Sequence, residues 1–146
     1  MTDTGATPPA APHVFAAAVR DEGPGRIQAQ VFTGAQTFLA DEPIEVGGGA
    51  TGPSPHHLLA AGLAACTTMT LRLYADRKDW PLERIHVTVD HIREPDAAPA
   101  DLFRRRIALS GPLDEAQKER LVQIAERCPV HRTLTAGARI ETAPSA

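Results

Sequence analysis

The stretch from residue 54 to residue 75, SPHHLLAAGLAACTTMTLRLYA, constrains the fold more than any other part of the chain. Ser54 can cap the first free N–H groups of a helix, Pro55 suits the first helical position, and Leu, Ala and Met dominate the residues after it. Over residues 58–69 nearly every side chain is apolar or small, whereas a surface helix confines such side chains to one stripe. We therefore predict a central helix that is buried on most sides and carries Cys66.

Alternating apolar and polar residues predict strands on both sides of this helix. The predicted strands cover residues 13–20, 26–32, 36–40, 85–92, 102–109 and 138–142. Asp114, followed three residues later by glutamine, resembles a capping box and predicts a second helix whose inward face includes Cys128. This order of elements indicates an α+β protein whose helices cover a mostly antiparallel sheet.

Length and composition bound the domain organisation and the partners. We expect residues 1–12, rich in Ala, Pro and Thr, to be a disordered tail and residues 13–146 to form one domain. The net charge of -3 and the lack of a concentrated basic run argue against nucleic acid as a partner. The triple arginine at residues 104–106 interrupts an apolar strand pattern, and we interpret it as a solvated strand face. We see neither a leader peptide nor an apolar run of membrane-spanning length, and so expect a cytoplasmic protein without a membrane partner.

A glycine-rich loop, GGGATG at residues 47–52, precedes the central helix. Such loops can cradle phosphate, but the Walker pattern ends in Gly-Lys-Ser/Thr and this loop contains no lysine. We therefore expect the glycines to serve a tight turn in which the backbone passes close to another group.

The chain has two cysteines, Cys66 and Cys128. Free cysteine packs well in cores, but two thiols on inward faces of two helices could also meet and cycle between dithiol and disulfide. Such a pair suits peroxide chemistry, because a thiolate attacks the O–O bond and the second thiol captures the resulting sulfenic acid. The attacking sulfur needs positive charge or hydrogen-bond donors nearby. The candidates are Arg26, His56, His57 and His131.

The string GPSPHHLLAAGLAACTTMTLRLYADRK, with DEP and GGG before it and ERCPVHRTL after it, resembles the OsmC/Ohr family of thiol-dependent peroxidases. The likeness runs from about residue 14 to residue 142 and is nearer to the general OsmC-like branch than to the organic-hydroperoxide-resistance branch. It implies an OsmC-like α+β fold in which two chains intertwine as a homodimer. Two long central helices would lie between the sheets, with the active sites at the subunit boundary.

The resemblance also implies roles for individual residues. Cys66 would be the peroxidatic cysteine and Cys128 the resolving cysteine. Arg26 would hold the thiolate, with Arg20 as the second candidate. The implied substrates are organic hydroperoxides reduced to alcohols, and the implied reductants are small or lipoyl-type dithiols, with no cofactor.

One position departs from the family pattern. Members active on organic hydroperoxides commonly carry a glutamate ten residues before the reactive cysteine, where this chain has His56. Glu42 or Glu45 in the preceding loop is a candidate substitute. Ten residues of straight helix span about 15 Å, so His56 cannot touch Cys66 within one unbroken helix. Either the helix breaks near Gly62 or the site is built by two subunits, and we favour the second.

Other interpretations of these residues stay open. His56 and His57 could be a solvated helix start, or could join Cys66, Cys128 and His131 in a zinc site, which we do not favour. Apolar residues could line an entrance that favours organic peroxides, or could be plain core: Leu63, Met69, Phe32 and Phe38. The alternative function is an OsmC-like binding or thiol-handling module with little peroxidase activity, holding an apolar ligand between subunits.

Overall fold

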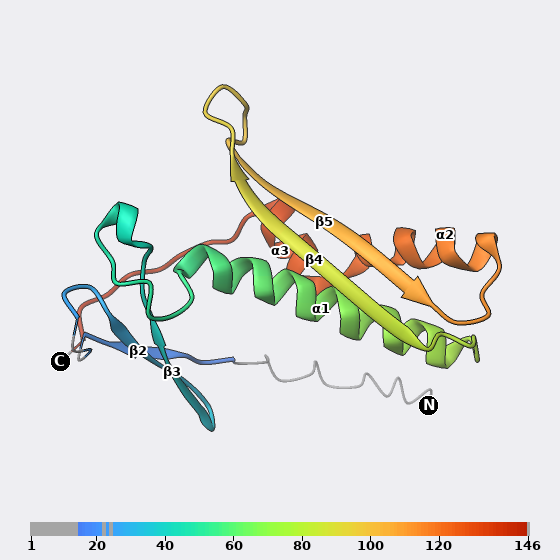
Figure 1. The fold of residues 1–146 in the computed structure, drawn as a ribbon, viewed down its shortest axis with the longest axis horizontal. Helices are drawn as coiled ribbons and strands as arrows, with labels where there is room; N and C mark the ends of the chain where they lie inside the picture. The colour runs from blue at the N-terminus through green and yellow to red at the C-terminus, as the bar shows by residue number, and fades with distance from the viewer. Residues whose placement is uncertain (1–14, 22, 24, 146) are drawn as a thin grey trace, which may run out of the picture. The chain divides into compact units, whose positions relative to one another are not determined.

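The computed structural model describes residues 15–21, 23 and 25–145, and the expected tail of residues 1–12 lies outside them (Figure 1). The chain forms two compact units that divide between Pro53 and Ser54. The expectation of a single domain over residues 13–146 stays a prediction.

The N-terminal unit is an antiparallel three-stranded sheet in the order β1 (Ala18–Arg20), β2 (Ala29–Thr33) and β3 (Gln36–Ala40). The predicted meander is therefore present, although β1 and β2 begin later in the chain than the alternation suggested. Val31 of β2 is buried and lies opposite Phe38 of β3. Beyond β3 comes a short 3-10 helix, η1 (Ile44–Val46), and then the glycine-rich loop.

The loop glycines are needed because the backbone passes close to other backbone atoms. A Cβ atom on Gly48 would overlap the carbonyl oxygen of Glu42, and one on Gly52 would overlap that of Leu39. A side chain at either position would therefore force the loop open. The expectation of a tight turn with a close approach is confirmed.

Asp41 holds this loop together from the inside. Its buried carboxylate accepts hydrogen bonds from the backbone N–H groups of Glu42 (2.8 Å), Gly49 (3.1 Å) and Thr51 (3.1 Å), and from the Thr51 hydroxyl (2.6 Å). These bonds, led by that from the Thr51 hydroxyl and opposed by burial, lower the pKa of Asp41 from 3.8 to about 2. The loop amides thus bind a carboxylate of the chain itself.

The C-terminal unit begins with the long helix α1 (Pro55–Arg77). Ser54 caps it by accepting from the His57 backbone N–H, and the His57 Nδ1 accepts from the Ser54 backbone N–H (3.1 Å). The helix runs unbroken through Gly62, which removes the first of the two explanations offered for the distance between His56 and Cys66. By length and mean hydropathy (1.3) α1 could cross a membrane, a test that core helices of soluble proteins also pass.

One stripe of α1 is buried, which contradicts the prediction that most of its surface is covered. The buried residues recur at helical spacing: Ala60, Leu63, Thr67, Leu71 and Ala75. On another face Leu59, Met69 and Leu73 are 46%, 65% and 55% exposed. The helix is therefore apolar all round but packed by its own chain on one side only.

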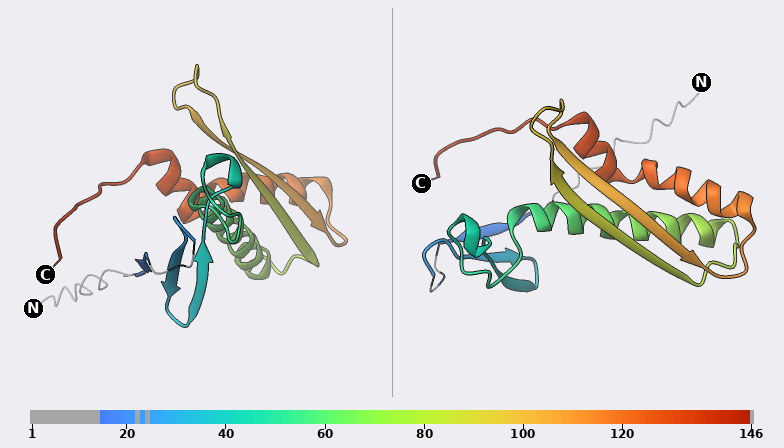
Figure 2. Two further views of the ribbon diagram at one scale, coloured as in Figure 1. Left: turned by 60° about the vertical axis from the view of Figure 1, so that its left-hand side comes forward. Right: turned by 45° about the horizontal axis from the view of Figure 1, so that its top comes forward.

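The remaining strands and helices of this unit lie along α1 (Figures 1 and 2). Strands β4 (Arg84–Arg93) and β5 (Asp101–Ser110) pair antiparallel as a long hairpin that crosses α1 obliquely. They are followed by α2 (Glu115–Ile124), η2 (Ala125–Arg127) and α3 (Pro129–Ala136). One core joins α1, α2 and one face of the hairpin: Leu71, Ala75, Leu82, Leu113, Leu121, Ile124 and Ala125, with Ile85, Ile107 and Leu109 against it.

The chain after Cys128 differs from the sequence-based expectation. Helix α3 was not predicted, although Pro129 stands at its first position and Gly137, with φ of 76°, follows its end. The strand predicted over residues 138–142 is absent, because the described residues 137–145 contain neither helix nor strand. Ile140 is 89% exposed there. Alternation alone does not make a strand where no neighbouring strand accepts its hydrogen bonds.

Candidate functional site

The two thiols meet where α1 passes the start of α3. Cys66 lies half-buried in the middle of α1, and Cys128 is fully buried at the N-cap of α3. Both are free, and their sulfur atoms are hydrogen-bond partners. The structure thus brings together the two side chains that the sequence analysis singled out.

Cys128 is the thiol that gives up its proton more readily. Burial alone would raise its pKa, but a hydrogen bond from Cys66, the backbone N–H groups of His131 and Val130, and the Thr67 side chain together lower it. The two N–H groups belong to the first turn of α3, where unpaired amides favour a negative charge.

Cys66 shows the opposite behaviour. Burial, followed by the hydrogen bond with Cys128, raises the pKa of the Cys66 thiol, although the Val130 backbone and the Thr70 side chain act the other way. The first proton lost by the pair therefore leaves Cys128, while Cys66 remains the donor in the shared bond. We expected the stabilised thiolate at Cys66; within this unit the stabilising groups gather around Cys128.

Arg105 of β5 is a residue of this site that the sequence analysis missed. Its guanidinium donates to the Thr67 hydroxyl (3.0 Å) and the Ala125 carbonyl (3.2 Å) and lies 3.3 Å from His131 Nδ1. The interpretation of residues 104–106 as a solvated face is therefore wrong for Arg105, although Arg104 and Arg106 are exposed. The sequence pattern could have predicted its inward position, because strand alternation places residue 105 on the same face as the apolar residues 103, 107 and 109.

The arginines and glutamates proposed from the resemblance belong to the N-terminal unit. Arg26 is exposed and borders a hollow of about 190 Å³ together with Asp41 and the loop glycines. The Arg20 guanidinium lies over the Phe32 ring, 5.2 Å from its centroid. Glu42 contributes its backbone to the loop, and Glu45 is exposed in η1. Their roles toward the thiols stay predictions.

The two histidines at the start of α1 do different things. His57 completes the capping box with Ser54. His56 is exposed, and its ring stacks on that of His91 with centroids 4.3 Å apart. His91 is half-buried between this ring and Phe103.

His56, His91 and Asp101 are also the group whose ligand atoms come close enough, within 4.8 Å, to suggest a metal among the residues described. Two observations oppose a cation there. Arg93 already contacts the Asp101 carboxylate (3.3 Å), and the positive end of the α1 dipole is adjacent. The zinc set considered from the sequence, which drew on Cys66, Cys128 and His131, does not form such a group in the described part of the chain.

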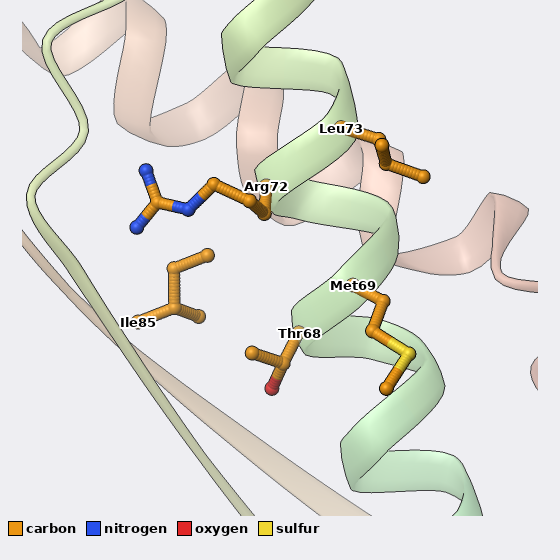
Figure 3. Close-up of a pocket in the computed structure, with 5 residues that line it drawn as sticks. All are labelled: Thr68, Met69, Arg72, Leu73 and Ile85. Atoms are coloured by element: carbon orange, nitrogen blue, oxygen red, sulfur yellow. The ribbon is translucent and has the colours of Figure 1, made fainter.

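Two cavities in the C-terminal unit have apolar linings. Figure 3 shows the larger, about 460 Å³, between α1 and β4: Thr68, Met69, Arg72, Leu73 and Ile85 line it. A second, of about 390 Å³, includes Leu63 and His131 in its lining and so lies beside the thiol centre. Of the proposed entrance residues, Met69 and Leu63 line these cavities, whereas Phe32 and Phe38 belong to the N-terminal sheet.

Solved structures with this fold come from several bacteria. A putative osmotic stress induced and detoxification response protein of Psychrobacter arcticus 273-4 has 19% identity and a TM-score of 0.68, covering 84% of this chain and 90% of that one. An organic hydroperoxide resistance protein OsmC of Legionella pneumophila has 26% identity and a TM-score of 0.61, covering 86% and 91%. A putative organic hydroperoxide resistance protein of Vibrio cholerae, with captopril in one active site, has 23% identity and a TM-score of 0.65, covering 87% and 88%.

A comparison with curated protein sequences found no match. The family model described as OsmC-like protein matches residues 47–143, which include the glycine-rich loop, α1 and both cysteines. The α+β architecture with its antiparallel strands agrees with the solved OsmC-like folds. The chain belongs to the OsmC-like protein family.

Proposed function

We propose that this chain is a thiol-dependent peroxidase that reduces organic hydroperoxides to alcohols. The observation that carries the proposal is the shared hydrogen bond between two free thiols, one half-buried and one fully buried. The family includes proteins named for organic hydroperoxide resistance, which supports the same chemistry. A dithiol of small or lipoyl type would supply the electrons.

The proposed reaction begins at Cys66, because it is the less buried sulfur. The Cys128 thiolate accepts the Cys66 proton through their shared bond, and Cys66 attacks the distal oxygen of ROOH. The O–O bond breaks, the alkoxide takes the proton held by Cys128 and leaves as ROH, and Cys66 becomes a sulfenic acid while Cys128 is again a thiolate. The Cys128 thiolate then attacks the Cys66 sulfur, forming the disulfide and displacing hydroxide, which takes a proton from solvent and leaves as water. Overall, two thiols and ROOH give one disulfide, ROH and water.

The amides at the start of α3 suit Cys128 to the second step. A sulfur held as a thiolate by the Val130 and His131 N–H groups is ready to attack as soon as the sulfenic acid forms. Fast capture protects Cys66 from further oxidation to the irreversible sulfinic acid. We therefore assign Cys66 the peroxidatic role and Cys128 the resolving role.

A second copy of the chain completes this proposal. Leu59, Cys66 and Leu73 follow one another at intervals of seven residues, which places Cys66 in line with the exposed apolar side chains of α1. A homodimer that covers these exposed side chains would also cover Cys66 and exclude water from it. Sedimentation of Leu73→Glu should show a shift to monomer, whereas Val122→Glu, at an exposed apolar position of α2, should leave the dimer intact. A wild-type monomer at all concentrations would refute the dimer.

Peroxide consumption tests the function directly. Purified protein with dihydrolipoamide should reduce cumene hydroperoxide faster than hydrogen peroxide. Cys66→Ser should abolish turnover, and Cys128→Ser should stop after one equivalent, leaving a sulfenic acid that dimedone traps for mass spectrometry. Val122→Ala, at an exposed position of α2, is the control and should stay active. Undiminished activity in Cys66→Ser, or no consumption by the wild type, would contradict the proposal.

The alternative is a binding or thiol-handling module, which the apolar cavity of about 460 Å³ and the histidine at position 56 favour. Such a module would bind an apolar ligand without consuming peroxide. Cumene alcohol, which cannot react, separates the two functions: a binding module should retain it in equilibrium dialysis and show no peroxide turnover.

A further inference from the structure

Arg105 links three segments around the thiol pair. From β5 its Nη1 donates to Thr67 Oγ1 on α1 (3.0 Å) and to the Ala125 carbonyl at the end of α2 (3.2 Å), and its Nη2 lies 3.3 Å from His131 Nδ1 on α3. Among the side-chain hydrogen bonds of the described residues, no other single side chain joins these three segments. The guanidinium therefore fixes where these helices sit relative to one another.

Arg105 forms no ion pair with a carboxylate of the described residues, whereas its neighbour Arg106 pairs with Asp90 at 2.8 Å. A half-buried cation whose partners are a hydroxyl, a carbonyl and an imidazole retains its positive field. That field favours an anion formed in the same region.

Two of the three partners of Arg105 also contact the Cys128 sulfur: the Thr67 side chain and the His131 backbone N–H. The Thr67 hydroxyl donates its one hydrogen to the Leu63 carbonyl (2.7 Å) and accepts from Arg105 (3.0 Å). Arg105 holds the oxygen in place, and the hydroxyl donates to the sulfur when its hydrogen rotates away from Leu63. Likewise, the contact at His131 is a hydrogen bond only when Nδ1 carries no proton, so Arg105 selects the Nε2–H tautomer.

We propose that Arg105 is the positioning residue of the dithiol centre: it clamps Thr67 and His131 against Cys128 and supplies the positive charge that favours the Cys128 thiolate. The proposal rests on the proposed function for its role in turnover, but the effect on the thiol is independent of peroxide. The titratable or charged groups around this sulfur are Cys66 on α1, His131 on α3 and, through its two contacts, Arg105 on β5.

The test is the pH titration of thiolate absorbance in the full chain. Arg105→Met keeps much of the side-chain length but removes charge and donors, and should move the first thiol midpoint up by about one pH unit, a roughly tenfold loss of thiolate below it. Arg105→Lys keeps the charge and should shift less. Arg104→Met, one residue away and exposed, is the matched control and should titrate like the wild type.

A second variant keeps the proposal testable if Arg105→Met does not fold. Thr67→Val has the same shape without the hydroxyl, removes one arm of the clamp, and should shift the midpoint in the same direction by a smaller amount. Wild-type titration in folded Arg105→Met, or an equal shift in Arg104→Met, would overturn the proposal.

Peroxidase assays on the same variants separate this proposal from the proposed function. If the wild type is inactive but its thiol midpoint still depends on Arg105, the proposed peroxidase function is refuted and the role of Arg105 is supported. If the wild type is active but its thiol midpoint does not depend on Arg105, the role of Arg105 is refuted and the peroxidase function is supported. Where both hold, disulfide formation after peroxide addition should be slower in Arg105→Met than in Arg104→Met.

Discussion

His91 Nε2 lies 2.9 Å from Asp101 Oδ1, across the β4–β5 hairpin on the diagonal between two register pairs that are two residues apart. This contact is the first cause of a lowered pKa at Asp101, which burial opposes and the charges of Arg93, His91 and His56 reinforce. The carboxylate therefore lies at the loop end of the hairpin, where its partner His91 also stacks on His56 at the start of α1.

We predict that His91→Ala raises the pKa of the Asp101 carboxyl toward 3.8, the value it has without partners. A group whose pKa is lowered by folding stabilises the fold above its unfolded pKa, and this contribution is lost as the pH falls through the folded value. Carbon-13 NMR titration of the carboxyl measures it. His86→Ala, on the opposite face of β4, should leave the Asp101 titration unchanged, and an unaltered titration in His91→Ala would contradict the assignment.

Asp41 should control the order of the glycine-rich loop. Because its pKa is lowered to about 2, the carboxylate stabilises the loop at and above pH 4, and the effect fades as the pH falls toward 2. Asp41→Asn should lower the hydrogen-exchange protection of the Gly49 and Thr51 amides at neutral pH. Glu45→Gln removes an exposed charge nearby and should not. Equal hydrogen-exchange protection in Asp41→Asn and wild type would show that the hydrogen bonds to Asp41 do not order the loop.

Two glycine substitutions should have opposite effects on stability. Gly52→Ala places a Cβ against the Leu39 carbonyl oxygen and should destabilise the chain by about 1–3 kcal/mol. Gly62→Ala lies inside α1 with nothing within 4 Å of the new Cβ, and should stabilise it by up to about 1 kcal/mol. Thermal or urea unfolding measures both. Destabilisation by Gly62→Ala would indicate that another copy packs on that part of α1.

Leu121 should dominate the packing of α2, because it is fully buried in the core with Leu71 and Ile124. Leu121→Ala should lower the free energy of unfolding by about 2–5 kcal/mol, the usual cost of a cavity at a leucine. Val122→Ala, whose side chain is 51% exposed on the same helix, should change it by less than about 0.5 kcal/mol. Urea unfolding of both variants measures the difference, and similar losses would contradict this assignment of the core.

Much of the architecture follows from local patterns. The cap at Ser54, the alternation in β4 and β5 and the capping box at Asp114 all appear where the sequence predicted them. Each of these inferences needed only the periodicity of one element and the requirement that apolar faces pack together. The sequence allowed Cys66 and Cys128 to meet but did not require it. Cys128 lies at the N-cap of α3, beyond the end of the second helix on which it was predicted, and Cys66 lies in line with exposed apolar side chains of α1.

The errors share a physical cause, which is that burial and pairing depend on what lies opposite. Residues 138–142 alternate like a strand but find no partner strand in the described chain. The apolar surface of α1 indicated burial on most sides, yet one chain covers only one stripe. Arg105 was predicted to face solvent because it is charged, although it lies on the same face of β5 as apolar residues. The local sequence pattern could not show that its guanidinium would contact Thr67 and His131.

The carboxylate of Asp41 has a consequence for what the glycine-rich loop can bind. Three donors, the Gly49 and Thr51 amides and the Thr51 hydroxyl, converge on one oxygen of that side chain. Such converging donors are how loops capture free oxyanions from solution. Here the Asp41 carboxylate, which is part of the chain, already occupies the position. Sulfate or phosphate could bind there only by displacing a side chain that cannot diffuse away.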